Sequence, residues 1–315
     1  MKTISRLNEV YKNAKEIPFD DTSKFVFFGD THRGDDSIAD EFGKNKHIFY
    51  HALNYYYQND FTYVEVGDGD ELWENSNFEH IRNSHFSVFN KLKEFYDAGR
   101  LYIIFGNHNM KMKSPDWVEK NMYSVYDEYL GEKVDLFPGL KVYEAFRFKH
   151  KKTHQEIFVV HGHQGDLIND QLAFISHFII RFFWHFMHLI GVRYAASPAK
   201  SRRKMHKVEK NYTKWNAQND TIIICGHTHR PKFPDPGESS YFNVGCGMHP
   251  RGITCLELIY GKLILVAWRV HSKKDGTLFI KRTALKGPVP IKAYDKTPPI
   301  KGKEIKDKSI QTKQE

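Results

Sequence analysis

Cysteine is scarce in this chain, which contains three cysteines among 315 residues. Cys225, Cys246 and Cys255 are odd in number and show no CxxC spacing, so the sequence indicates neither a disulfide framework nor a structural zinc knot. The first residues, MKTISRLNEVYKNAKEIPFDD, also lack the apolar core and small-residue cleavage site of a secretory signal. Both absences favour a reducing, cytoplasmic location.

The chain also lacks an uninterrupted apolar stretch of membrane-spanning length. The longest candidate, 172–190, contains four polar side chains at helical spacing, His177, Arg181, His185 and His188. Apolar residues occupy the other face, so the pattern predicts an amphipathic helix rather than a membrane span. Two interpretations stay open. The helix packs on the domain or on a partner subunit, or it forms a helical lid insert at 167–217, whose residues 172–207 contact acyl chains or a membrane surface.

Negative charge is scarce at the C-terminal end, and this accounts for most of the net charge of +9. Residues 272–315 hold eleven lysines and one arginine against five acidic residues. Because the final part of this segment is poor in large apolar residues, we expect a basic, partly disordered segment at 272–315 after one domain at 1–271. A nucleic-acid surface needs a basic stripe beside a cleft, and charge gathered in this segment gives no strong signal of one.

Five short apolar runs with polar ends predict the strands of a sheet. They are KFVFFGD (24–30), FTYVEVGD (61–68), LYIIFGN (101–107), EIFVVHG (156–162) and TIIICGH (221–227). Continuous apolar strands are typical of a sheet buried on both faces, and helical stretches separate the first three. Residues 133–160 and 241–280 instead indicate antiparallel hairpins. We therefore predict an α/β fold with a mixed sheet, and a functional site beyond the carboxyl ends of its strands.

The polar residues at these five strand ends are of the types that bind divalent transition metals: Asp30, His32, Asp68, Asn107, His161, His227 and His229. Alternate residues of an extended segment point to the same side, so Asp30 with His32, and His227 with His229, can each hold one ion. A single polar strand end is more often a turn. Recurrence at five strand ends favours a metal site.

The ordered set resembles the calcineurin-like metallophosphoesterases, whose motifs are D-x-H, GD, GNH, an isolated His and G-H-x-H. The resemblance covers about residues 24–250. It implies a layered α/β/β/α sandwich of mixed sheets flanked by helices, here with the lid insert. It also implies a binuclear metal centre: one ion is held by Asp30, His32 and His229, a second ion is held by Asn107, His161 and His227, and Asp68 bridges the two.

Such a centre predicts a phosphohydrolase. Two adjacent cations lower the pKa of a bridging water, and the resulting hydroxide attacks a phosphodiester, pyrophosphate or phosphomonoester. Nitrogen and oxygen ligands without a thiolate favour Mn²⁺, with Fe or Zn²⁺ as alternatives. In the family the histidine of GNH sits over the reacting phosphate. The resemblance therefore assigns His108 to protonating the leaving oxygen or to stabilising phosphoryl charge.

Four further residues are expected to support this site. The family usually has an acid directly after GNH, where this chain has Asn109, and an amide favours a charged His108 far less than a carboxylate does. Glu71, in the GDGDE stretch, is expected to orient a ligand histidine, and His163 is expected to support its loop. Arg251 is either a phosphate clamp or an ordinary surface arginine.

The GDGDELWE stretch and the insert before GHTH resemble, more loosely, the branch containing UDP-2,3-diacylglucosamine diphosphatases, which act on a lipid-linked sugar nucleotide. That branch typically has arginine in place of His108, which argues against this exact activity. The expected partner is a phosphoester substrate, amphiphilic if the lid binds acyl chains, with peripheral attachment to the cytoplasmic face of a membrane. A nuclease, and a catalytically weak metal-binding scaffold at the membrane surface, are the alternatives.

Overall fold

A computed structural model describes residues 3–127, 130–165 and 202–295. Its helices, in chain order, are α1 (Thr3–Asn13), α2 (Lys46–Gln58), α3 (Phe78–Ser84), α4 (Phe86–Asp97), α5 (Pro115–Met122) and α8 (Arg202–Gln218). Short 3₁₀ turns occupy Gly43–Asn45, Met110–Lys113 and Ile291–Tyr294. The strands form two large sheets and one small hairpin.

The larger sheet has seven strands in the order β14 (Leu278–Pro290), β13 (Lys262–Ser272), β12 (Ile253–Ile259), β2 (Lys24–Phe28), β3 (Thr62–Val66), β4 (Leu101–Ile104) and β7 (Val142–Tyr143). The other has five, in the order β1 (Lys15–Phe19), β8 (Ala145–His150), β9 (Glu156–Val160), β10 (Ile222–Cys225) and β11 (Tyr241–Asn243). Parallel pairing joins β2, β3 and β4, and also β9, β10 and β11. Antiparallel pairing joins β8 to β9 and β12 to β2 and β13. Both sheets are therefore mixed.

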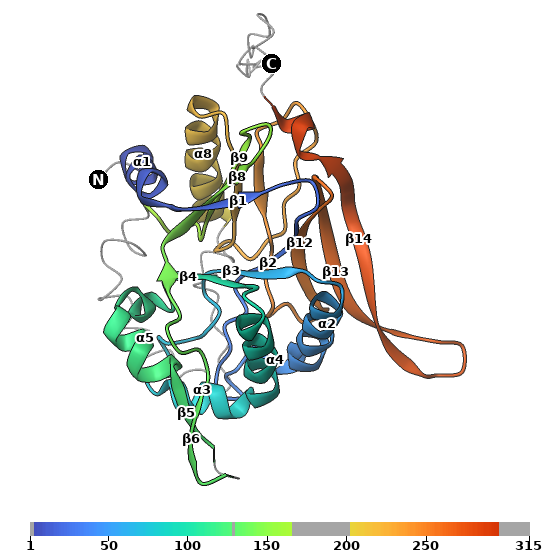
Figure 1. Ribbon diagram of the computed structural model, residues 1–315. Coiled ribbons are helices and arrows are strands. Elements are labelled where there is room, and N and C mark those ends of the chain that lie inside the picture. The colour runs from blue at the N-terminus through green and yellow to red at the C-terminus, as the bar shows by residue number, and fades with distance from the viewer. Residues whose placement is uncertain (1–2, 128–129, 166–201, 296–315) are drawn as a thin grey trace, which may run out of the picture.

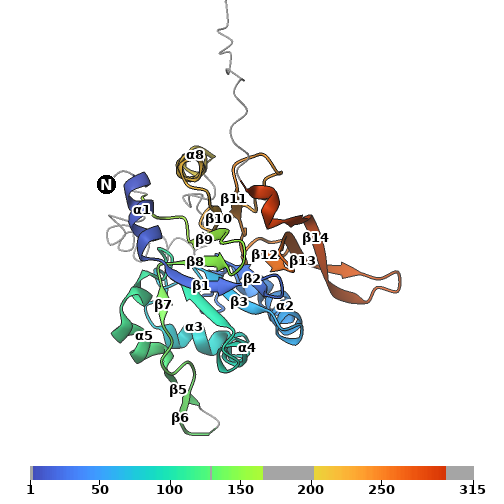
Figure 2. The ribbon, with the colours of Figure 1, turned by 45° about the horizontal axis from the view of Figure 1, so that its top comes forward.

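The two sheets lie face to face between two layers of helices (Figures 1 and 2). Helices α1 and α8 cover the outer face of the five-stranded sheet, and α2 and α4 cover that of the seven-stranded sheet. The small hairpin of β5 (Ser124–Asp127) and β6 (Glu132–Asp135) extends beside α5. This arrangement confirms the predicted α/β/β/α sandwich.

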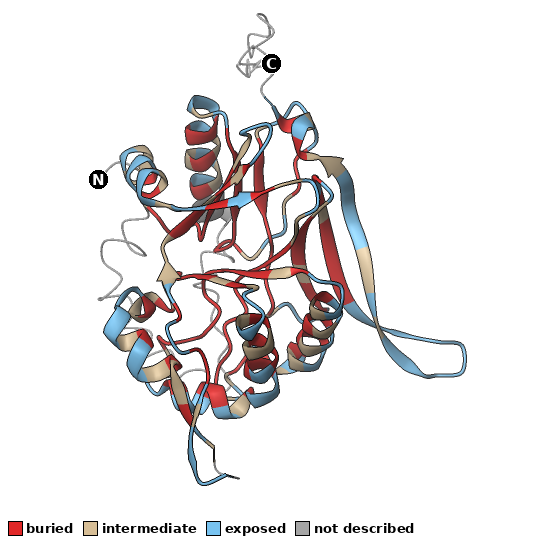
Figure 3. Cartoon of the chain, in the orientation of Figure 1, coloured by how far each residue is buried: buried red, intermediate tan, exposed pale blue. Residues whose placement is uncertain are grey.

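The inner strands are apolar because both of their faces are buried, whereas most of the edge strand β14 is exposed (Figure 3). In β2, Phe25 and Phe27 pack in the cluster between the two sheets, whereas Val26 and Phe28 pack against the helices. A third cluster joins the five-stranded sheet to α1 and α8. The five strands expected from apolar runs are all present, in β2, β3, β4, β9 and β10.

The helices follow from apolar spacing and from their caps. In α2 the buried residues are Ile48, Phe49, Ala52, Leu53 and Tyr56, which form one helical face. Helix α5 is capped by Ser114, whose side chain accepts a hydrogen bond from the backbone N–H of Trp117. Pro115 occupies the first helical position. The stretch 78–97 divides at His85, whose Nε2 lies 2.8 Å from Oδ2 of Asp40.

The expected antiparallel hairpins are present only in part. Strands β8 and β9 are antiparallel, as are β12, β13 and β14. However, β7 pairs in parallel with β4, and β11 pairs in parallel with β10. These two strands are two and three residues long, and such short strands carry too little pattern to reveal their partners.

The expected domain boundary after residue 271 is corrected by the hairpin of β13 and β14. Strand β13 runs to Ser272, and β14 pairs with it from Leu278 to Pro290. Beyond β14, Ile291 and Tyr294 are buried against the cluster between the sheets. Residues 272–295 thus belong to the sandwich, and three of the twelve basic residues that suggested a tail, Lys281, Arg282 and Lys286, lie on the edge strand β14. Residues 296–315 lie outside the described residues.

The expected lid at 167–217 is described only from residue 202, so the amphipathic stretch 172–190 lies outside the described residues. The part that is described, α8, packs through Val208, Tyr212 and Trp215 against the five-stranded sheet. It is therefore a helix of the outer layer and not a lid. Among the described helices, none is long and apolar enough to cross a membrane.

Candidate metal centre

The carboxyl ends of five strands meet at one place. Strands β2, β3 and β4 reach it from the seven-stranded sheet, and β9 and β10 reach it from the five-stranded sheet. Backbone bonds join their loops: the N–H of Asp30 donates to the carbonyl of Gly67 at 3.1 Å, and the N–H of Gly226 donates to the carbonyl of His161 at 2.9 Å. Residues predicted from five separate motifs are thereby brought together.

Five of the seven predicted ligands have a left-handed backbone. The φ angles are 51° for Asp30, 48° for His32, 50° for Asp68, 64° for His227 and 55° for His229. Non-glycine residues rarely adopt this conformation, which costs free energy and is concentrated at functional sites. It turns the chain sharply off each strand, so that the side chains face the loops of the neighbouring strands.

Close approach explains two of the glycines. A Cβ atom at Gly106 would lie 2.2 Å from Oδ1 of Asp68, and one at Gly226 would lie 2.3 Å from Oδ2 of Asp30. Both distances are far inside van der Waals contact, so the carboxylates occupy space that only a glycine leaves free.

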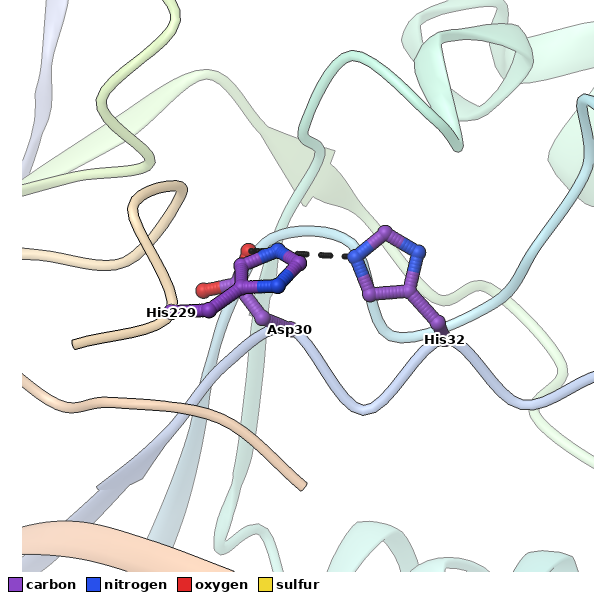
Figure 4. A group of neighbouring side chains, drawn as sticks. All are labelled: Asp30, His32 and His229. Carbon is purple, nitrogen blue, oxygen red and sulfur yellow. Dashed lines mark ion pairs between the residues drawn. The ribbon is translucent and has the colours of Figure 1, made fainter. Parts of the chain in front are cut away.

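One group of donors consists of Asp30, His32 and His229 (Figure 4). Nε2 of His229 lies 3.1 Å from Oδ1 of Asp30, and Nε2 of His32 lies 3.9 Å from the same oxygen. The other oxygen of Asp30 accepts a hydrogen bond from the backbone N–H of His227 at 2.7 Å. Asp30 thus directs one oxygen at two imidazoles while the backbone holds the second.

A second group consists of Asp68, His161 and His227, all buried. Nε2 of His161 lies 3.0 Å from Oδ2 of Asp68, and Nε2 of His32, from the first group, lies 3.9 Å from the same oxygen. Asp68 therefore lies between the two groups. Asn107 is also buried, and its side-chain oxygen has no hydrogen-bond partner among the described residues.

The donor atoms of both groups fit bound cations. Among the predicted ligands, five buried atoms have no hydrogen-bond partner within the described residues: Oδ1 of Asp30, Nε2 of His32, Oδ1 of Asn107, Nε2 of His161 and Nε2 of His227. His161 lies with Nδ1 2.8 Å from the carbonyl of Val66, to which it donates, and this contact directs its Nε2 at the carboxylate of Asp68. Burial opposes the charge of His161, but Asp68 raises its pKa, so a proton occupies this contact in the metal-free protein and a bound metal ion would replace it. Buried atoms without partners are costly, and a metal site removes that cost.

Charge within the site keeps its carboxylates ionised. Burial opposes ionisation of Asp30, but the imidazole of His229 holds the pKa of that carboxyl below its usual value. Burial likewise opposes the charge of Asp68, yet His161 and His108 hold its pKa well below the usual value. Both side chains are therefore anionic at neutral pH.

Glu71 joins His32 of the first group to His108. Its Oε2 lies 2.7 Å from Nδ1 of His32 and 2.7 Å from Nδ1 of His108. Burial opposes its charge, but His108 and His32 lower the pKa of Glu71, so the carboxylate accepts hydrogen bonds from both rings. The backbone N–H of His108 donates to Oδ1 of Asp68 at 2.8 Å. Nε2 of His108 is left without a partner among the described residues.

The other residues expected to support the site are placed differently. Asn109 accepts from the backbone N–H of Gly106 at 2.6 Å and approaches the sulfur of Met112 at 3.5 Å, so it does not contact His108. The carboxylate beside that ring comes from Glu71 instead. His163 is buried, its ring centroid is 5.4 Å from that of His161, and neither of its ring nitrogens has a hydrogen-bond partner in the part of the chain that the structure describes.

Arg251 is exposed, and its side chain forms no hydrogen bond or ion pair with the described residues. It lies in the turn before β12, where its backbone N–H approaches Nδ1 of His249 at 3.4 Å. Arg251 therefore makes no contact with the two groups of donor residues in the structure.

Two features of the site were missed in the sequence. Trp73 stacks on His108 with ring centroids 4.0 Å apart and an interplanar angle of 23°. Arg33 is buried and donates to Glu65 at 2.8 Å and to Asp70 at 2.7 Å, which ties the first two loops together. A signal for the second feature was available, because a charged residue such as Glu65 inside an apolar strand needs a buried partner.

Fold and site together define a metal-dependent phosphoesterase built from two facing sheets. Residues 23–231 match the family described as Calcineurin-like phosphoesterase, and the chain belongs to this family. Its members are metal-dependent hydrolases, so the chain is a hydrolase of phosphoesters. The match supports neither the diacylglucosamine diphosphatase branch nor a particular metal.

Similarity to individual proteins is low. No curated protein gave a significant match. One similar solved structure is the cold-active protein-tyrosine phosphatase of a psychrophile, Shewanella sp., with 14% identity, a TM-score of 0.35, and coverage of 86% of this chain and 82% of that chain. A mutant of a cold-active protein tyrosine phosphatase has the same identity and coverage, with a TM-score of 0.34. Similarities this low carry no conclusion about substrate.

Proposed function

We propose that this site holds two divalent metal ions and hydrolyses a phosphodiester, pyrophosphate or phosphomonoester. Asp30, His32 and His229 would hold one ion, Asn107, His161 and His227 would hold the other, and Asp68 would contact both. The observation that carries the proposal is a set of five buried donor atoms without hydrogen-bond partners among the described residues, four of which belong to the two groups that contain Asp30 and Asp68. Mn²⁺ is the favoured ion, with Fe or Zn²⁺ as alternatives, because the ligands are nitrogen and oxygen without thiolate.

Bound divalent cations supply positive charge to the phosphoryl oxygens and activate a water molecule for attack on phosphorus. The side chains of the protein would orient the reacting groups and donate a proton. His108 holds Nδ1 on the Glu71 carboxylate, which leaves Nε2 as the ring nitrogen that can donate a proton to the leaving oxygen. The backbone bond from His108 to Asp68 fixes this donor relative to the metal ligands.

His32 is prepared for metal binding by the same carboxylate. Glu71 accepts the proton on Nδ1, so the lone pair of the neutral ring is on Nε2, which faces Asp30 and Asp68. The tautomer that binds a metal is therefore selected by a neighbouring side chain. Loss of Glu71 would affect metal binding and proton donation together.

The proposed chemistry defines the substrate only as a phosphoester or phosphoanhydride. A lipid-linked or nucleotide phosphoester is our specific proposal, suggested by the amphipathic stretch 172–190 and the GDGDELWE motif. The presence of His108 where the diacylglucosamine diphosphatase branch has arginine favours a substrate whose leaving oxygen needs a proton.

The test is hydrolysis of a small panel by the Mn²⁺-loaded protein: p-nitrophenyl phosphate, bis(p-nitrophenyl) phosphate, and a UDP-sugar with and without acyl chains. We expect turnover of at least one ester, with loss of more than about 10²-fold in Asp68→Asn. The proposal fails if no ester is hydrolysed, or if Asp68→Asn hydrolyses the esters as well as the parent does. A chelator-treated sample reloaded with Mn²⁺, Fe²⁺ or Zn²⁺ ranks the metals.

A further inference from the structure

Trp73 contacts both members of the pair formed by Glu71 and His108. Its ring stacks on the imidazole, with centroids 4.0 Å apart and planes 23° from parallel. Its backbone N–H donates to Oε1 of Glu71 at 3.1 Å, while the other oxygen of Glu71 contacts Nδ1 of His108 at 2.7 Å. One residue therefore holds the carboxylate by its main chain and the imidazole by its side chain.

The indole is not available to stack on a substrate. Only 6% of Trp73 is exposed, and one face of its ring is occupied by His108. The side chain of His108, by contrast, is 20% exposed, so solvent or substrate reaches the histidine and not the tryptophan. This geometry separates a group that meets the substrate from a group that supports it.

Restraint of the imidazole plane needs more than the bond to Glu71. The torsion that rotates a histidine ring is broad, so a single hydrogen bond at Nδ1 leaves the ring free to swing about that contact. The stacked indole limits the swing on one face, and the ring of His32 meets the imidazole nearly edge on, at 4.5 Å and 81°. Together these contacts fix the direction in which Nε2 of His108 points.

We propose that Trp73 is the positioning residue for proton donation by His108, and that it thereby sets which leaving groups the enzyme can expel. The inference rests on the proposed function. A proton donor matters where the departing oxygen is strongly basic, as in phenyl or alkyl esters, and matters little for p-nitrophenolate, which departs as the anion. Misplacement of Nε2 lowers turnover of the first kind of ester selectively.

Two substitutions separate positioning from simple packing. Trp73→Phe keeps a flat ring that can stack on His108, whereas Trp73→Leu keeps an apolar side chain without a flat face. Neither changes the backbone N–H that bonds to Glu71. As a matched control, Trp117→Leu alters a partly buried tryptophan that packs on Phe78 in the helical layer.

The measurement is kcat and KM for p-nitrophenyl and phenyl esters of the same phosphate, with bound metal determined for each protein. We expect Trp73→Leu to lower kcat at least about tenfold more for the phenyl ester than for the p-nitrophenyl ester. KM and metal content should stay within about threefold of the parent. Trp73→Phe should restore most of the turnover of the phenyl ester, and Trp117→Leu should show no difference between the esters.

Equal losses on both esters in Trp73→Leu, or a loss that Phe does not restore, would overturn the role of Trp73 while leaving the phosphohydrolase intact. Loss of bound metal in Trp73→Leu would also overturn it, because the residue would then act through His32. Failure of the parent on every ester would instead overturn the proposed function and the role of Trp73 with it. If Trp73→Leu does not fold, Trp73→Phe is compared with the parent. A loss of kcat that is larger for the phenyl ester than for the p-nitrophenyl ester supports positioning by the indole, and equal losses for the two esters overturn it.

Discussion

Oε2 of Glu71 lies 2.7 Å from Nδ1 of His108, and the same oxygen lies 2.7 Å from Nδ1 of His32. One carboxylate oxygen thus contacts both a proposed metal ligand and the proposed proton donor. Its second oxygen accepts from the backbone N–H of Trp73 at 3.1 Å. Every hydrogen bond around this carboxylate has Glu71 as the acceptor, which makes the charge of Glu71 as important as its shape.

Glu71→Gln should impair both functions. An amide has one oxygen, so its NH₂ group must face either the two imidazole N–H groups or the backbone N–H of Trp73, and donor then meets donor. We expect metal affinity to fall by about 10- to 100-fold and kcat by about 10²-fold or more. Metal titration followed by steady-state kinetics at saturating metal separates the two effects.

The matched control is Glu132→Gln, which makes the same chemical change on the exposed strand β6. It should leave metal affinity and kcat within about twofold of the parent. Parent-like kinetics in Glu71→Gln at saturating metal would remove Glu71 from the proton-transfer pathway.

Asn109→Asp tests whether the side chain at the position after GNH changes the protonation of His108. The side chain of Asn109 is fully buried and bonds to the backbone of Gly106, not to His108. We therefore expect the pH profile of kcat to keep its shape. The free energy of unfolding should fall by about 1–3 kcal/mol, because a buried carboxylate replaces an amide. A displaced acidic limb in the rate profile would contradict this expectation.

The clustering of the proposed ligands could be predicted because each lies at the end of an apolar strand. Parallel strands end at one edge of a sheet, so Asp30, Asp68 and Asn107 had to lie close together once β2, β3 and β4 were identified. The approach of β9 and β10 from the second sheet does not follow from strand pairing. It depends on how the two apolar faces pack, and the motif resemblance supplied that information.

The supporting residues could not be predicted because their contacts depend on side-chain direction in irregular loops. Trp73 stands in a turn after Asp70, and no periodicity places its ring on His108. Asn109 was expected to act on His108 because the resembled family usually has an acid at this position, yet its side chain accepts a hydrogen bond from the backbone of Gly106. The basic strand β14 was mistaken for a tail because an exposed edge strand carries little apolar pattern.

Added metal should stabilise the fold. Buried donor atoms without partners cost free energy in the metal-free protein, and ions that bind only the folded state stabilise it by mass action. At a metal concentration about a hundredfold above Kd we expect a gain of about 2.7 kcal/mol, or about 5 °C in Tm. Differential scanning fluorimetry with Mn²⁺ and with a chelator measures this shift.

His161→Ala should lose at least half of the metal-induced rise in Tm, since it removes a buried donor atom that faces Asp68. His80→Ala is the matched control, because it removes an exposed histidine of α3 that makes no contact with the site. A rise in Tm that is the same in both variants would show that the ions bind elsewhere.

Glu74 gives the metal-free protein a stability that depends on pH. Burial, and then the charge of Glu71, raise the pKa of Glu74 to about 8 from the usual 4.5. Between these two values the folded state binds more protons than the unfolded state, so stability falls as pH rises. Nearby cations would lower this pKa, and the effect is therefore expected after chelation.

Glu74→Gln removes the charge that the folded state resists. At the upper end of the range from about 4.5 to about 8, the variant should be more stable than the parent by about 1–3 kcal/mol, and the difference should close toward the lower end. Urea unfolding at several pH values after chelation measures it, with Glu119→Gln on the exposed face of α5 as the control. An ordinary exposed glutamate titrates alike in the folded and unfolded states, so the control variant should show no dependence of stability on pH relative to the parent. If the difference in stability between Glu74→Gln and the parent did not vary with pH, the pKa of Glu74 would be the same in the two states.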